Sequence, residues 1–291
     1  MKKVLLFLSV VILPSMISLA QTDAACQKKI DSLSNRINYL ESNVKNSFNE
    51  KLVQVGLTTN LGMNFIIPGQ TKLIDKNGVG SCFSIGLAIN KTFKNSPTIG
   101  ISTGIEFDFE TNRYKTVDSV YYQYNGSKII GKGSAADATG TLSLQERNQK
   151  SIYVSVPLMM LFRTSMIGDF RYFGKFGIRN SFLIKNTVND LGIDVTNPTQ
   201  QIANVENNSF SSPGDMFFYK GSIGLSAGAE WKFISTTSLV AEVGYFYGIT
   251  PLHLERKESN RTLYTEAAGT RTYFSNKANQ NQLLFKISIL F

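Results

Sequence analysis

From residue 53 to residue 291 the chain repeatedly alternates apolar and polar positions. In 53–65, "VQVGLTTNLGMNF", the apolar residues Val53, Val55, Leu57, Leu61, Met63 and Phe65 share one face. A period of two predicts β-strands. The same period recurs in seven further segments, at 83–93, 99–110, 152–162, 170–184, 217–233, 239–249 and 281–291. Most of these eight strands are long enough to cross a bilayer at a tilt.

The connections between these strands alternate between short and long. Short ones lie near 94–97, 163–169 and 234–237, and long ones near 66–82, 111–151, 185–216 and 250–280. All short turns then lie at one end of the sheet, as in outer-membrane barrels with short periplasmic turns and long outer loops. With an even number of strands, we expect both termini in the periplasm.

The two faces of the strands distinguish a membrane barrel from a soluble barrel of the lipocalin type, which is apolar inside. The polar face is mostly small, as in Gly56, Ser84, Gly104, Ser226 and Gly228, which suits a narrow lumen. Aromatic residues gather at both ends of the apolar face, as interfacial anchoring requires. We therefore expect an all-β fold, an eight-stranded antiparallel transmembrane β-barrel over 51–291 with its apolar face toward lipid.

The first fifty residues have a different pattern. Residues 1–20 have a basic start, an apolar run and small residues at the end, as in a secretory signal peptide. Within the periplasmic segment 21–50, heptad spacing predicts a short helix over 26–50 with one apolar seam. It would either bind a partner or a second copy, or lie against the base of the barrel. The seam consists of Ile30, Leu33, Ile37, Leu40 and Val44.

The charge balance changes this picture little. Formal net charge is +9, and removal of Lys2 and Lys3 with the signal peptide leaves +7. In an exported protein, basic groups facing anionic lipid and lipopolysaccharide are a better explanation than nucleic acid. Cys26 and Cys82 are predicted a membrane thickness apart, so we expect no disulfide between them, although Cys26 could pair with its copy in a second chain.

The same parity places many charged side chains inside the barrel. They would form a salt-bridged plug, because unpaired buried charge is costly. The alternative is a narrow, anion-leaning pore, since bases outnumber acids eight to five. Several large side chains predicted to point inward argue against an open channel, namely those of Tyr153, Phe173, Leu183, Phe218 and Phe246. The predicted inward charges are Glu106, Asp108, Glu110, Glu230, Glu242, Arg163, Arg171, Lys175, Arg179, Lys185, Lys220, Lys232 and Lys286.

Candidate chemistry is sparse. The single histidine, His253, is predicted on an outer loop near Glu255 and Ser259, so a rim hydrolase or acyltransferase is a further alternative. A lone loop histidine is more often solvated, and we expect no enzyme, no cofactor and no metal. The oxygen-rich stretch 189–197 matches no EF-hand spacing.

The last strand ends on an aromatic residue. Its alternating residues Phe285, Ile287, Ile289 and Phe291 resemble the insertion signal read by the bacterial barrel-assembly machinery. We expect this strand to close the sheet against the first, because only a closed sheet leaves no unpaired backbone groups in a membrane.

The stretches "IYVSVPLMMLF", "RYFGKFGIRNSFLI", "GSIGLSAGAEWKF", "VAEVGYFYGITPL" and "NQLLFKISILF" resemble the PorT-like outer-membrane barrel family of Bacteroidetes. The resemblance covers roughly 51–291 and leaves 26–50 outside. It implies an outer-membrane location in such a bacterium and a connection with type IX protein secretion, and it carries no catalytic motif. The function we expect is a structural or interaction subunit of an outer-membrane assembly, with residues 26–50 contacting a protein partner.

Overall fold

The computed structural model describes residues 29–38, 52–197, 199, 201–202, 210–211, 216–234, 237–253, 255 and 257–291. The chain divides into two units, 1–50 and 51–291. In the first unit, residues 29–38 form a helix. The predicted signal peptide, Cys26, Leu40 and Val44 lie outside the described residues.

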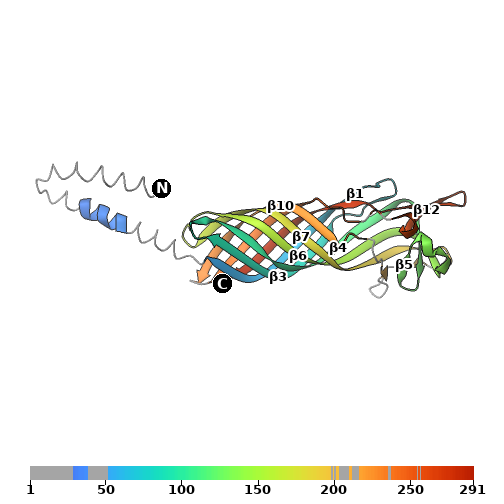
Figure 1. Cartoon of the computed structure of the whole chain (residues 1–291), viewed down its shortest axis with the longest axis horizontal. Coiled ribbons are helices and arrows are strands. Elements are labelled where there is room, and N and C mark those ends of the chain that lie inside the picture. Colours follow the sequence, from blue (N-terminus) through green and yellow to red (C-terminus); the bar gives the residue numbers. More distant parts are fainter. Residues whose placement is uncertain are drawn as a thin grey trace, which may run out of the picture. The chain divides into compact units, whose positions relative to one another are not determined.

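Eight long antiparallel strands of the second unit form a closed ring (Figure 1). β14 pairs with β11 on one side and with β1 on the other, which closes the sheet. The eight-stranded prediction is confirmed. In ring order the strands are β1 (Val53–Pro68), β3 (Gly80–Phe93), β4 (Ser96–Asn125), β6 (Gly140–Arg163), β7 (Phe170–Asp194), β10 (Tyr219–Ile234), β11 (Thr237–Gly248) and β14 (Ala278–Leu290).

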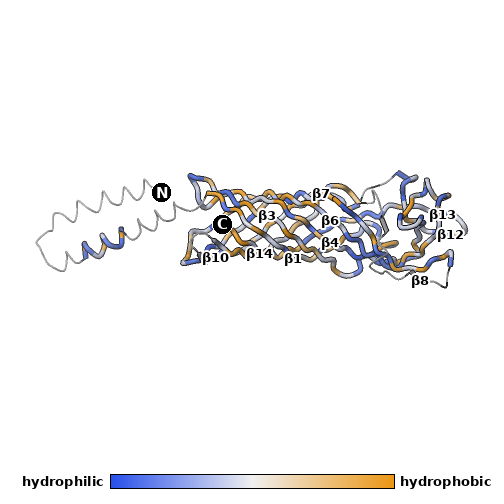
Figure 2. Tube along the Cα trace, turned by 90° about the horizontal axis from the view of Figure 1, so that it is seen from below, coloured by the Kyte–Doolittle hydropathy of each residue, from blue (hydrophilic) through white to orange (hydrophobic). Residues whose placement is uncertain are grey.

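The predicted orientation of the two faces is also found. Leu57 and Ile287 point outward and are 59% and 55% exposed, while Ser226 is 4% exposed inside. Figure 2 shows apolar positions alternating with more polar ones along the strands of the barrel. Exposed aromatic side chains mark both ends of this wall. One ring contains Phe65, Phe107, Phe109, Phe182, Tyr245 and Tyr247, and the other contains Phe93, Phe162, Phe170, Tyr172, Trp231, Phe233 and Phe291.

Glycine allows the strands to approach one another closely. A Cβ atom added to Gly56 would lie 1.8 Å from the carbonyl oxygen of Ile289, and one added to Gly104 would lie 2.1 Å from that of Leu87. Both contacts are with backbone, so a side chain would force the strands apart. The small residues of the inward face therefore permit a narrow barrel.

Three strands continue well past the membrane-facing wall, which corrects the prediction of long loops at 111–151 and 185–216. β4, β6 and β7 contain 30, 24 and 25 residues. Their extensions pair with one another as far as Leu142 opposite Asp194. Beyond the apolar band the outward face meets water, so the alternation that marks a lipid-facing strand ends there. Register shifts at Lys115/Val120 and Leu144/Glu146 interrupt it further.

Short elements cover these extensions, and together they form what we call the cap. They are β2 (Ile74–Lys76), β5 (Lys128–Ile130), β8 (Gln201–Ile202), β9 (Phe210–Ser211), β12 (Leu263–Ala267), β13 (Thr270–Phe274) and the 3₁₀ turns Lys132–Asp137 and Glu258–Asn260. The cap has its own hydrophobic core, which includes Tyr122, Leu142, Val188, Leu252 and Leu263. The β12 and β5 labels in Figure 1 mark this end, opposite the C-terminus.

Among the described residues, no helix has the length and apolar content needed to cross a membrane. Cys82 of β3 is a free thiol, and it is buried against Met159, Phe246 and Leu284.

Candidate functional site: the barrel interior

At the end of the interior that lies near the C-terminus, the Glu230 carboxylate accepts hydrogen bonds from residues of two other strands. Glu230 of β10 accepts hydrogen bonds from Arg171 of β7, Nε to Oε2 at 2.7 Å and Nη2 to Oε1 at 2.8 Å. Gln54 of β1 donates to the same carboxylate at 3.0 Å and accepts from Arg163 of β6 at 2.8 Å. This cluster therefore links four strands around one charge-assisted centre.

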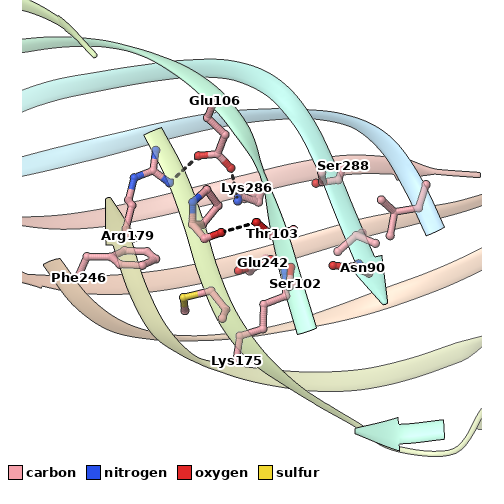
Figure 3. Close-up of a pocket in the computed structure, with 15 residues that line it drawn as sticks. Asn90, Ser102, Thr103, Glu106, Lys175, Arg179, Glu242, Phe246, Lys286 and Ser288 are labelled. Carbon is pink, nitrogen blue, oxygen red and sulfur yellow. Dashed lines mark hydrogen bonds and ion pairs between the residues drawn. The ribbon is translucent and has the colours of Figure 1, made fainter. Parts of the chain in front are cut away.

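The central cluster is built around Arg179 of β7. Its guanidinium binds Asp108 through Nη2, at 2.7 and 2.8 Å, and Glu106 through Nη1. Lys286 of β14 donates to Glu106 Oε1 at 2.6 Å, and Asn60 of β1 donates at 3.0 Å to Oε2, the oxygen that Arg179 binds. Figure 3 shows Glu106 between Arg179 and Lys286. Both carboxylates are at most 1% exposed, so these pairs replace the water that the charges lost on burial.

Two further pairs complete the filling. Lys175 of β7 donates to Glu242 of β11 at 2.6 Å, and Ser226 donates to the same carboxylate at 2.6 Å. Closer to the cap, Lys220 of β10 binds Glu110 of β4. Gln280 and Gln282 of β14 also donate to Glu110, at 3.0 and 2.8 Å.

Two of the predicted inward charges are not in the interior. Lys185 is exposed because the register shifts between Ile152 and Tyr153, which leaves Ile184 as an extra residue on β7 and reverses the parity beyond it. Lys232 is exposed beside a second irregularity, where β10 ends. Six of the predicted bases and five of the predicted acids remain inside, so the excess of positive charge is smaller than predicted.

Apolar side chains fill the space between the ion pairs. Leu161, Phe173, Val240 and Leu290 form one layer, and Cys82, Met159, Phe246 and Leu284 form another. The cavity beside Lys175, Arg179 and Glu242 has a volume of about 20 Å³, close to the space that one water molecule needs. Of the predicted bulky residues, Tyr153, Phe173 and Phe246 are buried as expected. Leu183 is partly buried against the cap core, and Phe218 is 63% exposed because it precedes β10.

Above the interior, the cap contains an ion pair that the sequence did not suggest. Arg147 of β6 binds Asp190 of β7 through Nε at 2.9 Å and Nη2 at 2.7 Å. Both side chains are at most 2% exposed. After the register shift at Leu144/Glu146, inward and outward residues alternate again, and Arg147 and Asp190 lie on the buried face. This alternation was the only feature of the sequence from which the ion pair could have been predicted. Asp190 and Asp194 belong to the oxygen-rich stretch 189–197, of which residues 189–194 are part of β7 and 195–197 form the turn that follows.

His253 lies inside the cap rather than on a solvated loop. It is 2% exposed, and its Nε2 is 3.0 Å from the Tyr114 hydroxyl. Glu255 is exposed and pairs with Lys277 at 2.9 Å, and Ser259 is exposed in a 3₁₀ turn. The expectation of a solvated histidine is wrong, because the His253 ring is buried and forms hydrogen bonds with Tyr114 and Asn276. Among the described residues, no cluster of three or more His, Cys, Asp or Glu side chains could hold a metal ion.

The sequence model of the outer membrane protein beta-barrel domain matches residues 31–254. This span is most of the chain and most of the strand ring. The chain belongs to this family. It is an integral β-barrel protein of the bacterial outer membrane, and its outer wall faces lipid. Comparison with curated protein sequences finds no similar protein.

Solved structures similar to this outer membrane protein beta-barrel domain include OprG of Pseudomonas aeruginosa, at 8% identity and a TM-score of 0.42, covering 84% of this chain and 97% of OprG. Neisserial surface protein A is 9% identical with a TM-score of 0.30 and coverages of 81% and 97%. The attachment invasion locus protein Ail of Yersinia pestis is 12% identical with a TM-score of 0.30 and coverages of 83% and 100%.

Two other sets of predicted residues lie on surfaces of this family member. Ile30, Leu33 and Ile37 of the helical seam are 51%, 53% and 55% exposed. The terminal residues Phe285, Ile287, Ile289 and Phe291 all lie on the outward face, between 40% and 55% exposed.

Proposed function

We propose that this protein is a non-enzymatic structural or interaction subunit of an outer-membrane assembly. The observation that carries the proposal is the filled interior of the described barrel, in which paired charges and apolar layers surround a cavity of about 20 Å³ beside Lys175, Arg179 and Glu242. A barrel filled in this way gives a solute no path, which argues against the narrow pore. Its function would then depend on its surfaces, namely the cap, the outer wall and the N-terminal segment.

The orientation we propose places the cap outside the cell and both termini in the periplasm. It is supported by the short turns at the end of the barrel that carries Phe291, since barrels of this class have short periplasmic turns. The alternating outward residues of β14 would be read by the barrel-assembly machinery before the strand closes against β1.

The N-terminal segment is the proposed protein-binding element. Three apolar side chains of one seam, Ile30, Leu33 and Ile37, are each about half exposed. An apolar stripe with heptad spacing is what a partner helix packs against. Leu40 and Val44 would lengthen the stripe.

The resemblance to the PorT-like family supports a connection with protein secretion in a Bacteroidetes-type bacterium. A catalytic role for His253 has little support, because its ring is enclosed by Tyr114 and Asn276 and because Glu255 pairs with Lys277. We therefore propose no hydrolase or acyltransferase activity, no cofactor and no nucleic-acid partner.

Crosslinking in intact membranes tests the partner-binding element. The full-length variant Leu33→Glu/Ile37→Glu should insert normally but lose its protein crosslinks, because two charges interrupt the seam. The matched control Asn35→Glu/Asn38→Glu adds the same charges away from the seam and should keep the crosslinks. Unchanged crosslinking in the seam variant, or equal loss in both, would contradict the proposal.

A further inference from the structure

Three cations lie together on the outer wall just beyond the aromatic ring at the cap end of the barrel. Arg113 of β4, Lys150 of β6 and Lys185 of β7 are all exposed. Lys150 stands opposite Thr111 on one neighbouring strand and opposite Thr187 on the other. Arg113 is two residues beyond Thr111 on β4, so the three cations share one patch on three adjacent strands.

The register shift described above creates this patch. The extra residue Ile184 turns Lys185 from the inward to the outward face, where it stands opposite Ile152. Lys185 and Lys150 then line one surface cleft, with a volume of about 240 Å³. The other outward side chains of the cleft are Phe109, Thr111, Ile152 and Thr187.

Within the residues that the structure describes, the cations of the patch have no acidic partner. No ion pair joins Arg113, Lys150 or Lys185 to a carboxylate in the described part of the chain. Glu110, which also borders the cleft, points into the barrel and binds Lys220. Lys115, the next outward cation on β4, differs because it stands opposite both Asp75 and Glu146.

Two other exposed cations of the cap, in contrast, form ion pairs. Lys277 binds Glu255 at 2.9 Å, and Arg271 binds Glu266 at 3.3 Å. On the opposite wall, Ile67 of β1, Asn279 of β14 and Ile249, which directly follows β11, are exposed beyond the aromatic residues. Arg113, Lys150 and Lys185 therefore give this side of the barrel a local excess of positive charge.

At the lower border of the cleft, Phe109 and Ile152 are in register with Lys185, and Lys150 lies two residues closer to the cap. Phe109 stacks on Phe83 with ring centroids 6.3 Å apart, and both belong to the lipid-facing wall. Lys150 and the Thr111 and Thr187 hydroxyls follow directly above. This order, from apolar surface to hydroxyl and ammonium donors, matches an amphiphile whose acyl chains lie below an anionic head group.

We propose that this cleft binds the phosphate of a phosphorylated glycolipid in the outer leaflet of the membrane. Lys150 and Lys185 contact the phosphate oxygens, with Arg113 above them and the two threonine hydroxyls as additional donors. The acyl chains lie against Phe109 and Ile152. The assignment to the outer leaflet rests on the proposed orientation, with the cap outside the cell.

Binding by the purified full-length protein in detergent tests the site. The probes are a phosphorylated hexaacyl disaccharide glycolipid, the same lipid without phosphate, and inorganic phosphate. Wild type should bind the phosphorylated lipid, and Lys150→Gln/Lys185→Gln should bind it at least about tenfold more weakly, because two charge-assisted contacts are lost. The matched control Lys91→Gln/Lys94→Gln removes two exposed lysines at the other end of the barrel and should bind like wild type.

Three results would overturn the proposal: equal binding of the dephosphorylated lipid, equal loss in the control variant, or binding of inorganic phosphate without binding of the lipid. Because these measurements in detergent do not depend on orientation, a separate readout tests the orientation that was proposed with the function. An epitope inserted between Ala268 and Gly269, in the exposed β12–β13 turn, should be accessible on intact cells. Lipid binding together with an inaccessible epitope would overturn the outer-leaflet assignment and leave the phosphate site itself in place.

Discussion

Arg179 and Asp108 form an ion pair across the barrel interior, between strands that are not neighbours. Arg179 Nη2 lies 2.7 Å from Asp108 Oδ1, and the two side chains are 1% and 0% exposed. β6 separates β7 from β4 in the ring. The pair therefore braces the barrel from inside, in addition to the hydrogen bonds of its wall.

Replacement of Arg179 should be strongly destabilising. Arg179→Ala leaves Glu106 and Asp108 without their shared cation, and breaking a buried pair costs about 3–5 kcal/mol. The free energy of unfolding, measured by urea titration in lipid vesicles, should fall by roughly that amount. In the control Arg271→Ala, which breaks a half-exposed pair, the loss should stay below about 1 kcal/mol. Equal losses in the two variants would show that the interior pair does not brace the barrel.

The filled interior should also be electrically silent. Single-channel recording of wild type in planar bilayers should show no stable conductance, because ion pairs and apolar layers occupy the lumen. Stable anion-selective openings that disappear in Lys175→Gln or Arg179→Gln, and persist in Lys91→Gln on the outer wall, would favour the pore instead.

The wall of the barrel could be predicted from the sequence because its two faces lie in different environments, lipid outside and a narrow lumen inside. Lipid selects apolar residues at every second position, and a narrow lumen selects small ones between them. Leu57, Gly104 and Ile287 each follow from this rule. Ion pairing in the lumen could be predicted because the alternation placed charged residues on the inward face, where unpaired charge is costly. The basic partners of Glu106 and Glu242 were among the predicted inward residues.

The cap could not be predicted in this way. Its strands meet water on the outside, so β4 and β6 continue without an alternation of apolar residues. The extra residue at Ile184 exchanges the two faces of β7 without any local sequence signal, which is why Lys185 was placed inside. His253 depends on contacts with Tyr114 and Asn276, which are distant in sequence.

The stability contributed by the Tyr124–Asp194 contact, at the cap end of β4, should change with pH only outside a broad neutral range. The Tyr124 hydroxyl donates to Asp194 Oδ2 at 2.9 Å. Burial, the hydrogen bond to Asp194 and its negative charge raise the pKa of Tyr124 to about 12. Although partial burial acts in the opposite direction, hydrogen bonds from Thr196 and Tyr124 hold the pKa of Asp194 below its ordinary value of 3.8.

The two pKa shifts determine how the stability of the folded state changes with pH. A lowered pKa of Asp194 stabilises the folded state above about pH 3.8, and this contribution disappears as the pH falls through the folded pKa. A raised pKa of Tyr124 stabilises it below pH 10.0, and this contribution is lost as the pH rises through about 12. Tyrosinate absorbance, taken as the difference between wild type and Tyr124→Phe, should show the transition near 12. In Asp194→Asn it should move toward 10.0, and an unchanged midpoint would show that Asp194 does not act on Tyr124.

The last residue should influence assembly more than final stability. Phe291 lies outward and is 55% exposed, and its N–H donates to the carbonyl oxygen of Val55 at 2.8 Å where the sheet closes. Phe291→Ala removes the terminal aromatic and retains this backbone bond, so assembled barrels should unfold like wild type. Pulse-chase measurement of the folded form should show severalfold slower assembly. Phe233→Ala is the matched control, since Phe233 is 44% exposed in the same aromatic ring but lies on β10. If both variants slow assembly equally, interfacial anchoring is responsible; slowing by Phe291→Ala alone identifies Phe291 as part of the insertion signal.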